Sequence, residues 1–135
     1  MIKDLEVEEN VAFQGKVARD KLLQLYKEYD FLLFPSNFNE PLGVVLLEAM
    51  SQKLPIIATK AGAIPEVITH EVNGLLVTPE DSIMMAEAVK RLVETPSLAQ
   101  KISSNGIRRI REEFNTDKIM DRLEDYLKRR LTIDT

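Results

Sequence analysis

Two glutamates, Glu40 and Glu48, lie on either side of Gly43 and are the residues best placed to do chemistry. The apolar run 31–34 predicts a buried strand, and 43–52 predicts the helix that follows it. In an open α/β sheet, ligands bind where strands end, and the free N–H groups of a helix N-terminus favour an anion such as a phosphate. A glycine there lets the backbone approach that anion closely. The spacing therefore predicts an anion site with two carboxylates beside it.

The glutamate pair is weak evidence on its own, because this spacing arises by chance in a chain with many glutamates. Glu48 has apolar neighbours in the sequence, so an ionised carboxylate there needs a partner. An arginine of the same chain could be that partner, which would make Glu48 structural. Glu40 could be an exposed loop carboxylate stabilised by the helix dipole. The residues alone leave the structural and the functional interpretation of both side chains open.

Short β-rich runs alternate with longer helical patterns from Val11 onward, as in a parallel sheet covered by helices. We expect strands at 11–14, 31–34, 55–58 and 74–77. We expect helices at 19–29, 43–52, 82–95, 97–114 and 116–131, and a short segment at 66–68 after turn residues. The third helix is indicated by the helical spacing of Ile83, Ala86, Val89 and Val93. The prediction is an α/β fold, a Rossmann-like parallel sheet with helices on both faces. Doubly wound sheets usually have more strands, so residues 1–135 are expected to form one domain that lacks its first strands.

The composition limits the kinds of function. The chain has 135 residues, 44% of them hydrophobic and 30% charged, which is typical of one folded domain. Its 18 basic and 22 acidic residues give a net charge of −4, which argues against non-specific binding of nucleic acid or anionic lipid. The lack of cysteine excludes disulfides, thiolate catalysis and sulfur-ligated zinc, and a cytoplasmic location is expected. His70 is the one histidine and has no second ligand type near it, so we expect a surface residue and no metal site. Met84 and Met85 are expected in the core and at its rim rather than in a cofactor site.

An ordered set of motifs resembles the C-terminal domain of GT-B glycosyltransferases, specifically the glycosyltransferase family 4 (glycosyl transferases group 1) type. These enzymes transfer a sugar from a nucleotide-sugar with retention of anomeric configuration. The motifs are Val11-Ala12-Phe13-Gln14-Gly15, Asp30 before 31–36, Glu40-x7-Glu48-Ala49-Met50, Pro55-Ile56-Ile57-Ala58, Gly62, Ile64-Pro65-Glu66-Val67-Ile68 and Asn73-Gly74-Leu75-Leu76-Val77. The stretch from Val11 to Leu76 carries the resemblance, and the tail matches more loosely.

The resemblance implies a role for each site residue. Glu48 would accept hydrogen bonds from the ribose hydroxyls of the donor, and Glu40 would face the donor sugar near its reacting carbon, as the catalytic carboxylate. The backbone of Pro41, Leu42, Gly43 and Val44 would lie against the sugar and the diphosphate, and that of Gly15, Lys16 and Val17 would meet the base. A UDP-, GDP- or ADP-sugar would be the substrate, with no metal and no other cofactor. The chain has no Asp-x-Asp motif, which holds a divalent metal in other glycosyltransferases.

The chain departs from the family pattern in several places. Pro41-Leu42 stands where Gly-Phe is common, which alters the detail of the sugar pocket. Lys53 stands where a helix-ending glycine is usual, so we expect this helix to end differently. The family also has earlier strands that bring an Arg and a Lys to the diphosphate, and an N-terminal domain that binds the acceptor. These do not precede Met1, so the chain alone is expected to be inactive and to self-associate through an exposed sheet edge.

Two other functions compete with this interpretation. A non-catalytic nucleotide-binding or regulatory module could have the same fold, and activity of the full-length product would separate the two. A nicotinamide-dependent oxidoreductase shares the fold class, but no Gly-x-Gly-x-x-Gly follows any expected strand. A peripheral association of the full-length enzyme with a membrane stays open.

Overall fold

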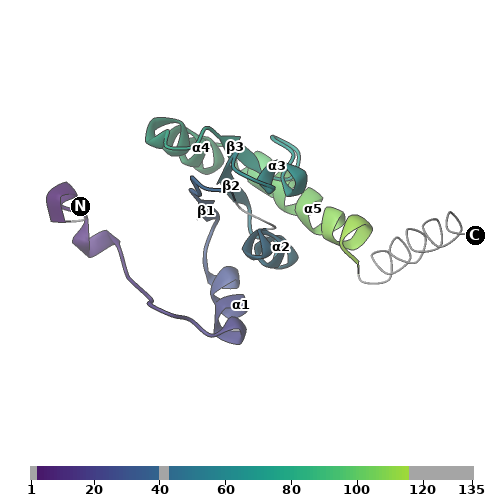
Figure 1. Ribbon diagram of the computed structural model, residues 1–135, viewed down its shortest axis with the longest axis horizontal. Helices are drawn as coiled ribbons and strands as arrows, with labels where there is room; N and C mark the ends of the chain where they lie inside the picture. Colours follow the sequence, from purple (N-terminus) through teal and green to yellow (C-terminus); the bar gives the residue numbers. More distant parts are fainter. Residues whose placement is uncertain (1–2, 40–42, 116–135) are drawn as a thin grey trace, which may run out of the picture.

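The computed structural model describes residues 3–39 and 43–115 (Figure 1). Two short 3-10 helices come first, η1 (Lys3–Leu5) and η2 (Glu8–Asn10). The α-helices are α1 (Arg19–Glu28), α2 (Val44–Ser51), α3 (Ile64–Val67), α4 (Ser82–Glu94) and α5 (Pro96–Glu113). The strands are β1 (Leu32–Phe34), β2 (Ile56–Thr59) and β3 (Leu75–Val77).

The three strands form one parallel sheet in the order β1-β2-β3. Leu33 pairs with Ile57 across the first ladder, and Ala58 pairs with Leu76 across the second. Because all three strands run in the same direction, their carboxyl ends meet at one edge of the sheet. The loops that leave this edge lead to α2, α3 and α4.

Helices cover both faces of the sheet, as predicted. Ile56 and Ala58 belong to a buried cluster with residues of α2, while Ile57 belongs to a second cluster with residues of α4. Side chains along a strand point alternately to opposite faces, so β2 supplies both layers. All four residues of β2 are buried, because the strand lies between two others and under two layers of helix.

Helix α5 packs against both helical layers. Its early residue Ile102 belongs to the α4 cluster, and its later residue Ile110 packs on the α2 cluster. Gly106 of α5 lies against α2, since a Cβ added at this glycine would lie 3.4 Å from Met50 Cγ of α2. A small residue at this point lets α5 lie close to α2. Helix α5 thus supports the helix that carries Glu48.

Helix α4 is confirmed, but it is buried through a different stripe from the one expected. Ile83 and Val93 are exposed, whereas Ala88 and Leu92 are buried. Met84 and Met85 pack on the same cluster as Ala88 and Leu92, as expected of core and rim residues. Both stripes are apolar and both have helical spacing, so the sequence period could not choose between them.

The strand expected at 11–14 is absent from the structure. The segment is extended and exposed, and the side chain of Phe13 is 84% exposed. Extended backbone becomes a strand only when a neighbouring strand pairs with it, and no described strand lies beside this segment. The described sheet therefore has three strands rather than four. Strand β1 was expected to be buried on both faces, but Leu33 is 42% exposed, and among the described residues β1 is an edge strand that pairs only with β2.

The end of α2 also differs from expectation, because Lys53 takes the conformation usually reserved for glycine. Its φ is +62°, in the left-handed region. The Lys53 N–H donates to Met50 O at 3.0 Å, and the Leu54 N–H donates to Ala49 O at 3.1 Å, which is the Schellman pattern. Ser103 Oγ of α5 donates to Lys53 O at 2.5 Å. These bonds and the burial of Leu54 offset the cost of about 1 kcal/mol for a left-handed lysine.

The remaining expected elements lie close to their observed bounds. The segment expected at 66–68 is the short helix α3. Asp81 caps α4 by accepting a hydrogen bond from the Met84 N–H at 2.8 Å, and Pro96 begins α5 at the position where its missing N–H costs nothing. The helix expected at 116–131 lies outside the described residues. Among the helices that are described, none is both long enough and apolar enough to cross a membrane.

Candidate functional site

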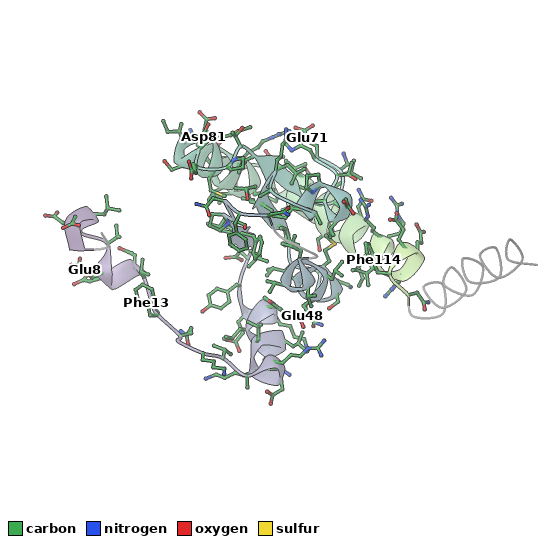
Figure 2. All side chains as sticks on the ribbon, viewed as in Figure 1. Glu8, Phe13, Glu48, Glu71, Asp81 and Phe114 are labelled. Atoms are coloured by element: carbon green, nitrogen blue, oxygen red, sulfur yellow. The ribbon has the colours of Figure 1, made fainter. Side chains whose placement is uncertain are left out.

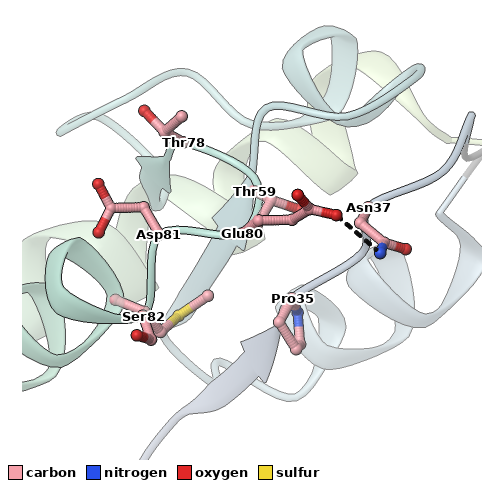
Figure 3. Close-up of a pocket in the computed structure, with 8 residues that line it drawn as sticks. Pro35, Asn37, Thr59, Thr78, Glu80, Asp81 and Ser82 are labelled. Atoms are coloured by element: carbon pink, nitrogen blue, oxygen red, sulfur yellow. Dashed lines mark hydrogen bonds between the residues drawn. The ribbon is translucent and has the colours of Figure 1, made fainter.

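A pocket of about 260 Å³ lies at the carboxyl edge of the sheet, between the loops that follow β1 and β3 (Figure 3). Its lining residues are Pro35, Asn37, Thr59, Thr78, Glu80, Asp81, Ser82 and Met85. Asn37 Nδ2 donates to Glu80 Oε1 at 3.4 Å across the pocket. The lining contains two carboxylates and no basic side chain, so the pocket itself disfavours a phosphate.

The N-terminus of α2, at the same edge, has the features of an anion site. Its N-cap, Gly43, has φ 63° and ψ 45° and gives no side-chain cap. A Cβ at Gly43 would be strained and would lie 3.0 Å from Leu46 Cδ1. Gly43 therefore places no side chain of its own over the N–H groups of Val44 and Val45, which begin the helix. Three expected site residues, Glu40, Pro41 and Leu42, lie outside the described residues.

Glu48 lies on α2 and forms an ion pair with Arg19 of α1. Arg19 Nε donates to Glu48 Oε1 at 2.8 Å. The Glu48 side chain is 13% exposed, whereas that of Arg19 is 76% exposed. An arginine is thus the partner that the apolar surroundings of Glu48 required. The pair links the first residue of α1 to α2, the helix on which Glu48 is labelled in Figure 2.

Tyr26 lies two turns along α1 from Arg19, and its hydroxyl interacts electrostatically with the Glu48 carboxylate. Its side chain is buried, and its hydroxyl has no hydrogen-bond partner among the described residues. Burial raises the pKa of the Tyr26 hydroxyl, and the negative charge of Glu48 raises it further. Tyr26 therefore stays neutral, and its OH group remains a donor, over the physiological pH range.

The segment expected to meet the base leads directly into this pair of helices. Gly15 has φ +62° and is exposed, and a Cβ added there would meet no atom within 4 Å. Lys16 is exposed and Val17 is half-buried. Val17 stands two residues before Arg19, so the segment ends beside the Arg19–Glu48 pair. The structure shows no contact that ties Gly15 or Lys16 to the described part of α2.

Asn73, the first residue of the motif that ends at Val77, is a buried link in the support of α2. Asn73 Oδ1 accepts a hydrogen bond from the Thr69 N–H at 2.6 Å. Asn73 Nδ2 donates to Val67 O at 3.0 Å and contacts Met50 Sδ of α2 at 3.9 Å. Arg109 of α5 also reaches this loop, through Thr69 Oγ1 at 2.8 Å. No periodicity marks a buried asparagine in a turn, so the sequence carries no signal for it.

His70 lies in the loop between α3 and β3, where it forms an isolated bridge with Gly74. The side chain is 45% exposed, and its Nδ1 accepts a hydrogen bond from the Leu76 N–H at 2.9 Å. The neighbouring Glu71 pairs with Arg91, and this guanidinium lowers the pKa of the Glu71 carboxyl. Within residues 3–39 and 43–115, no group of three or more His, Cys, Asp or Glu side chains is arranged to hold a metal ion.

Comparisons with known proteins agree with this arrangement. The family model described as glycosyl transferases group 1 matches residues 1–109. An uncharacterized glycosyltransferase of Methanocaldococcus jannaschii is 36% identical over 115 residues, which are 85% of this chain and 29% of the relative. The N-acetyl-alpha-D-glucosaminyl L-malate synthase of Bacillus anthracis is 33% identical over 124 residues, which are 92% of this chain and 32% of the relative.

Solved structures show the same similarity. Anabaena HepE in complex with UDP has a TM-score of 0.87 at 31% identity, over 94% of this chain and 34% of that chain. The same protein has also been solved with UDP-glucose, and with UDP and glucose. The chain spans about a third of the length of these relatives. The Rossmann-like sheet expected from the sequence is thus the fold of glycosyltransferases of the GT-B type.

Proposed function

Because the chain belongs to the glycosyl transferases group 1 family, we propose that it binds the nucleotide-sugar donor of a glycosyltransferase that acts with retention of configuration. One observation carries the proposal. A nearly buried carboxylate, Glu48, lies on the helix whose glycine N-cap opens toward the carboxyl edge of the sheet. A helix N-terminus suits the diphosphate, and a carboxylate accepts hydrogen bonds from ribose hydroxyls. The complexes of HepE with UDP and UDP-glucose support this ligand class.

The proposed site assigns each part of the donor to a different segment. The diphosphate and the sugar lie against the backbone of Pro41, Leu42, Gly43 and Val44, and the ribose lies against Glu48. The base meets the backbone of Gly15, Lys16 and Val17. Glu40 faces the reacting carbon of the sugar, where its charge stabilises the positive charge that develops as the nucleoside diphosphate leaves. The donor is the substrate, and no further cofactor is proposed.

Glu48→Gln tests the proposal. In the complete gene product we expect the donor KM to rise about tenfold, because a hydrogen bond to a charged group is worth about 1.5–3 kcal/mol. The measurement is initial-rate kinetics with the UDP-, GDP- or ADP-sugar that the native protein uses. Glu28→Gln is the matched control, since it removes one exposed carboxylate from the end of α1. A donor KM that stays within twofold of native would contradict the ribose assignment.

We further propose that the acceptor binds to a separate N-terminal domain, and that the 135-residue chain alone is inactive and self-associates. The free edge of β1 supports self-association. Among the described residues β1 pairs only with β2, and Leu33 of β1 is 42% exposed. An unpaired strand edge with apolar side chains is a template for pairing with a second copy.

For the chain produced alone, we expect light scattering to give the mass of a dimer or a larger species. Leu33→Lys should shift the chain toward monomer, because a lysine on an edge strand opposes strand pairing. Ile83→Lys is the matched control, since Ile83 is 72% exposed on α4 and does not belong to the sheet. A native chain that is strictly monomeric, or a Leu33→Lys variant that stays dimeric, would argue against the β1 edge as the interface.

A further inference from the structure

We propose that Arg19 is a positioning residue for the donor ribose, acting through its hydrogen bond to Glu48. This inference rests on the proposed function, because it assumes that Glu48 contacts ribose. Arg19 Nε holds one carboxylate oxygen, Oε1, at 2.8 Å. The bond holds the Glu48 carboxylate in one orientation through Oε1 and leaves its other acceptor positions for the ribose.

The stoichiometry of hydrogen bonds allows this arrangement. An ionised carboxylate has about four acceptor positions on its two oxygens. Arg19 occupies one of them, through Nε alone, and among the described residues no other side chain or backbone group donates to the Glu48 carboxylate; Ser51 Oγ donates to the backbone oxygen of Glu48. At least two positions are left, which is the number that two ribose hydroxyls need. A second, bidentate contact from the guanidinium would have left fewer positions for the ribose.

The difference in exposure between the two side chains argues for a role in binding rather than in folding. Arg19 is 76% exposed, and an ion pair with such an exposed partner contributes little to the free energy of unfolding. Glu48 is 13% exposed, so its orientation depends strongly on the few groups that reach it. Arg19 is the cation that pairs with it in the described part of the chain.

Tyr26 does not compete with Arg19 for this role. Its hydroxyl is buried and has no hydrogen-bond partner among the described residues, so it does not hold the Glu48 carboxylate. The two residues lie on α1, but only Arg19 bonds to Glu48. Arg19 is also the first residue of α1, two positions after Val17. It thus connects the segment proposed to meet the base with the carboxylate proposed to hold the ribose.

Discrimination between ribose and deoxyribose tests the proposal directly. Calorimetry on the complete gene product would measure the Kd of UDP, GDP and ADP and of their 2′-deoxy forms. For the nucleotide that the native protein binds best, we expect the 2′-deoxy form to bind about tenfold more weakly. Arg19→Ala should reduce this ratio to about threefold or less, and Glu48→Gln should reduce it to about one. In the Arg19→Ala/Glu48→Gln double variant the ratio should equal that of Glu48→Gln, because Arg19 acts through Glu48.

Lys21→Ala is the matched control, because it removes one exposed positive charge from the same helix. It should keep the native ratio within about twofold and should melt within about 3 °C of Arg19→Ala. Equal weakening of both nucleotides by Arg19→Ala, with an unchanged ratio, would overturn the proposal and assign Arg19 to the phosphates. An unchanged Kd for both nucleotides would also overturn it. A native protein that does not discriminate between the two sugars, or binds none of the nucleotides, would instead refute the proposed function.

Discussion

Glu40→Gln should lower kcat for sugar transfer by about 100-fold or more in the complete gene product, with little change in nucleotide affinity. The substitution keeps the size of the side chain and removes its negative charge. Removing one group that stabilises transition-state charge typically costs 10²- to 10³-fold in kcat, by order of magnitude. The ground state carries less charge at the sugar carbon, so we expect the Kd of the nucleoside diphosphate to change by less than about threefold.

The position of Glu40 in the chain supports this difference between kcat and binding. The residue stands three positions before Gly43, whose left-handed conformation opens the N-terminus of α2. It thus precedes the helix in the chain, whereas Glu48 belongs to the helix itself. Single-turnover rates and calorimetry with the released nucleotide separate the two effects, and Glu28→Gln again serves as the control. A loss of nucleotide affinity as large as the loss of kcat would assign Glu40 to binding instead.

The buried elements of the fold, such as β2 and α2, were predictable from sequence because their local sequence patterns were enough to identify them. The run 55–58 is apolar throughout, as expected of a strand buried on both faces, and β2 is buried at every residue. Helix α2 begins at Val44 with Gly43 as its N-cap, within one residue of the expected start. In these places local periodicity and turn chemistry agree with the packing that the structure shows.

The predictions that failed concern residues whose conformation depends on the elements that pack beside them. The run 11–14 has the composition of a strand, but its side chains are exposed and no described strand pairs with it. Lys53 takes a left-handed conformation because backbone bonds and Ser103 of α5 stabilise it. Arg19 could not be chosen as the partner of Glu48, since the two are 29 residues apart and nothing in the sequence brings α1 against α2. Side-chain partners across elements are therefore the information that the structure adds.

Asn73→Ala should lower the free energy of unfolding by about 2–3 kcal/mol, the largest stability effect that we expect from a polar residue here. The Asn73 side chain satisfies the Thr69 N–H and the Val67 carbonyl, both of which would lose their partner in the variant. Each unsatisfied buried group costs about 1–3 kcal/mol. Water can enter the adjoining polar pocket of about 200 Å³ and replace part of the loss, so we expect a value near the lower end of the summed range.

Urea unfolding of Asn73→Ala beside Asn105→Ala measures this effect. Asn105 also donates to the loop, to Val72 O at 2.8 Å, but that bond is exposed, so its loss should cost less than about 1 kcal/mol. Asn73→Asp keeps the acceptor for the Thr69 N–H but places a buried carboxylate oxygen against Val67 O, so at pH 7 it should be at least as destabilising as Asn73→Ala. Because Asn73 also contacts Met50 of α2, the Asn73→Ala protein should bind nucleotide more weakly as well, through the helix that carries Glu48. Equal stability of the Asn73→Ala and Asn105→Ala proteins would show that the buried bonds of Asn73 do not hold this loop against α2.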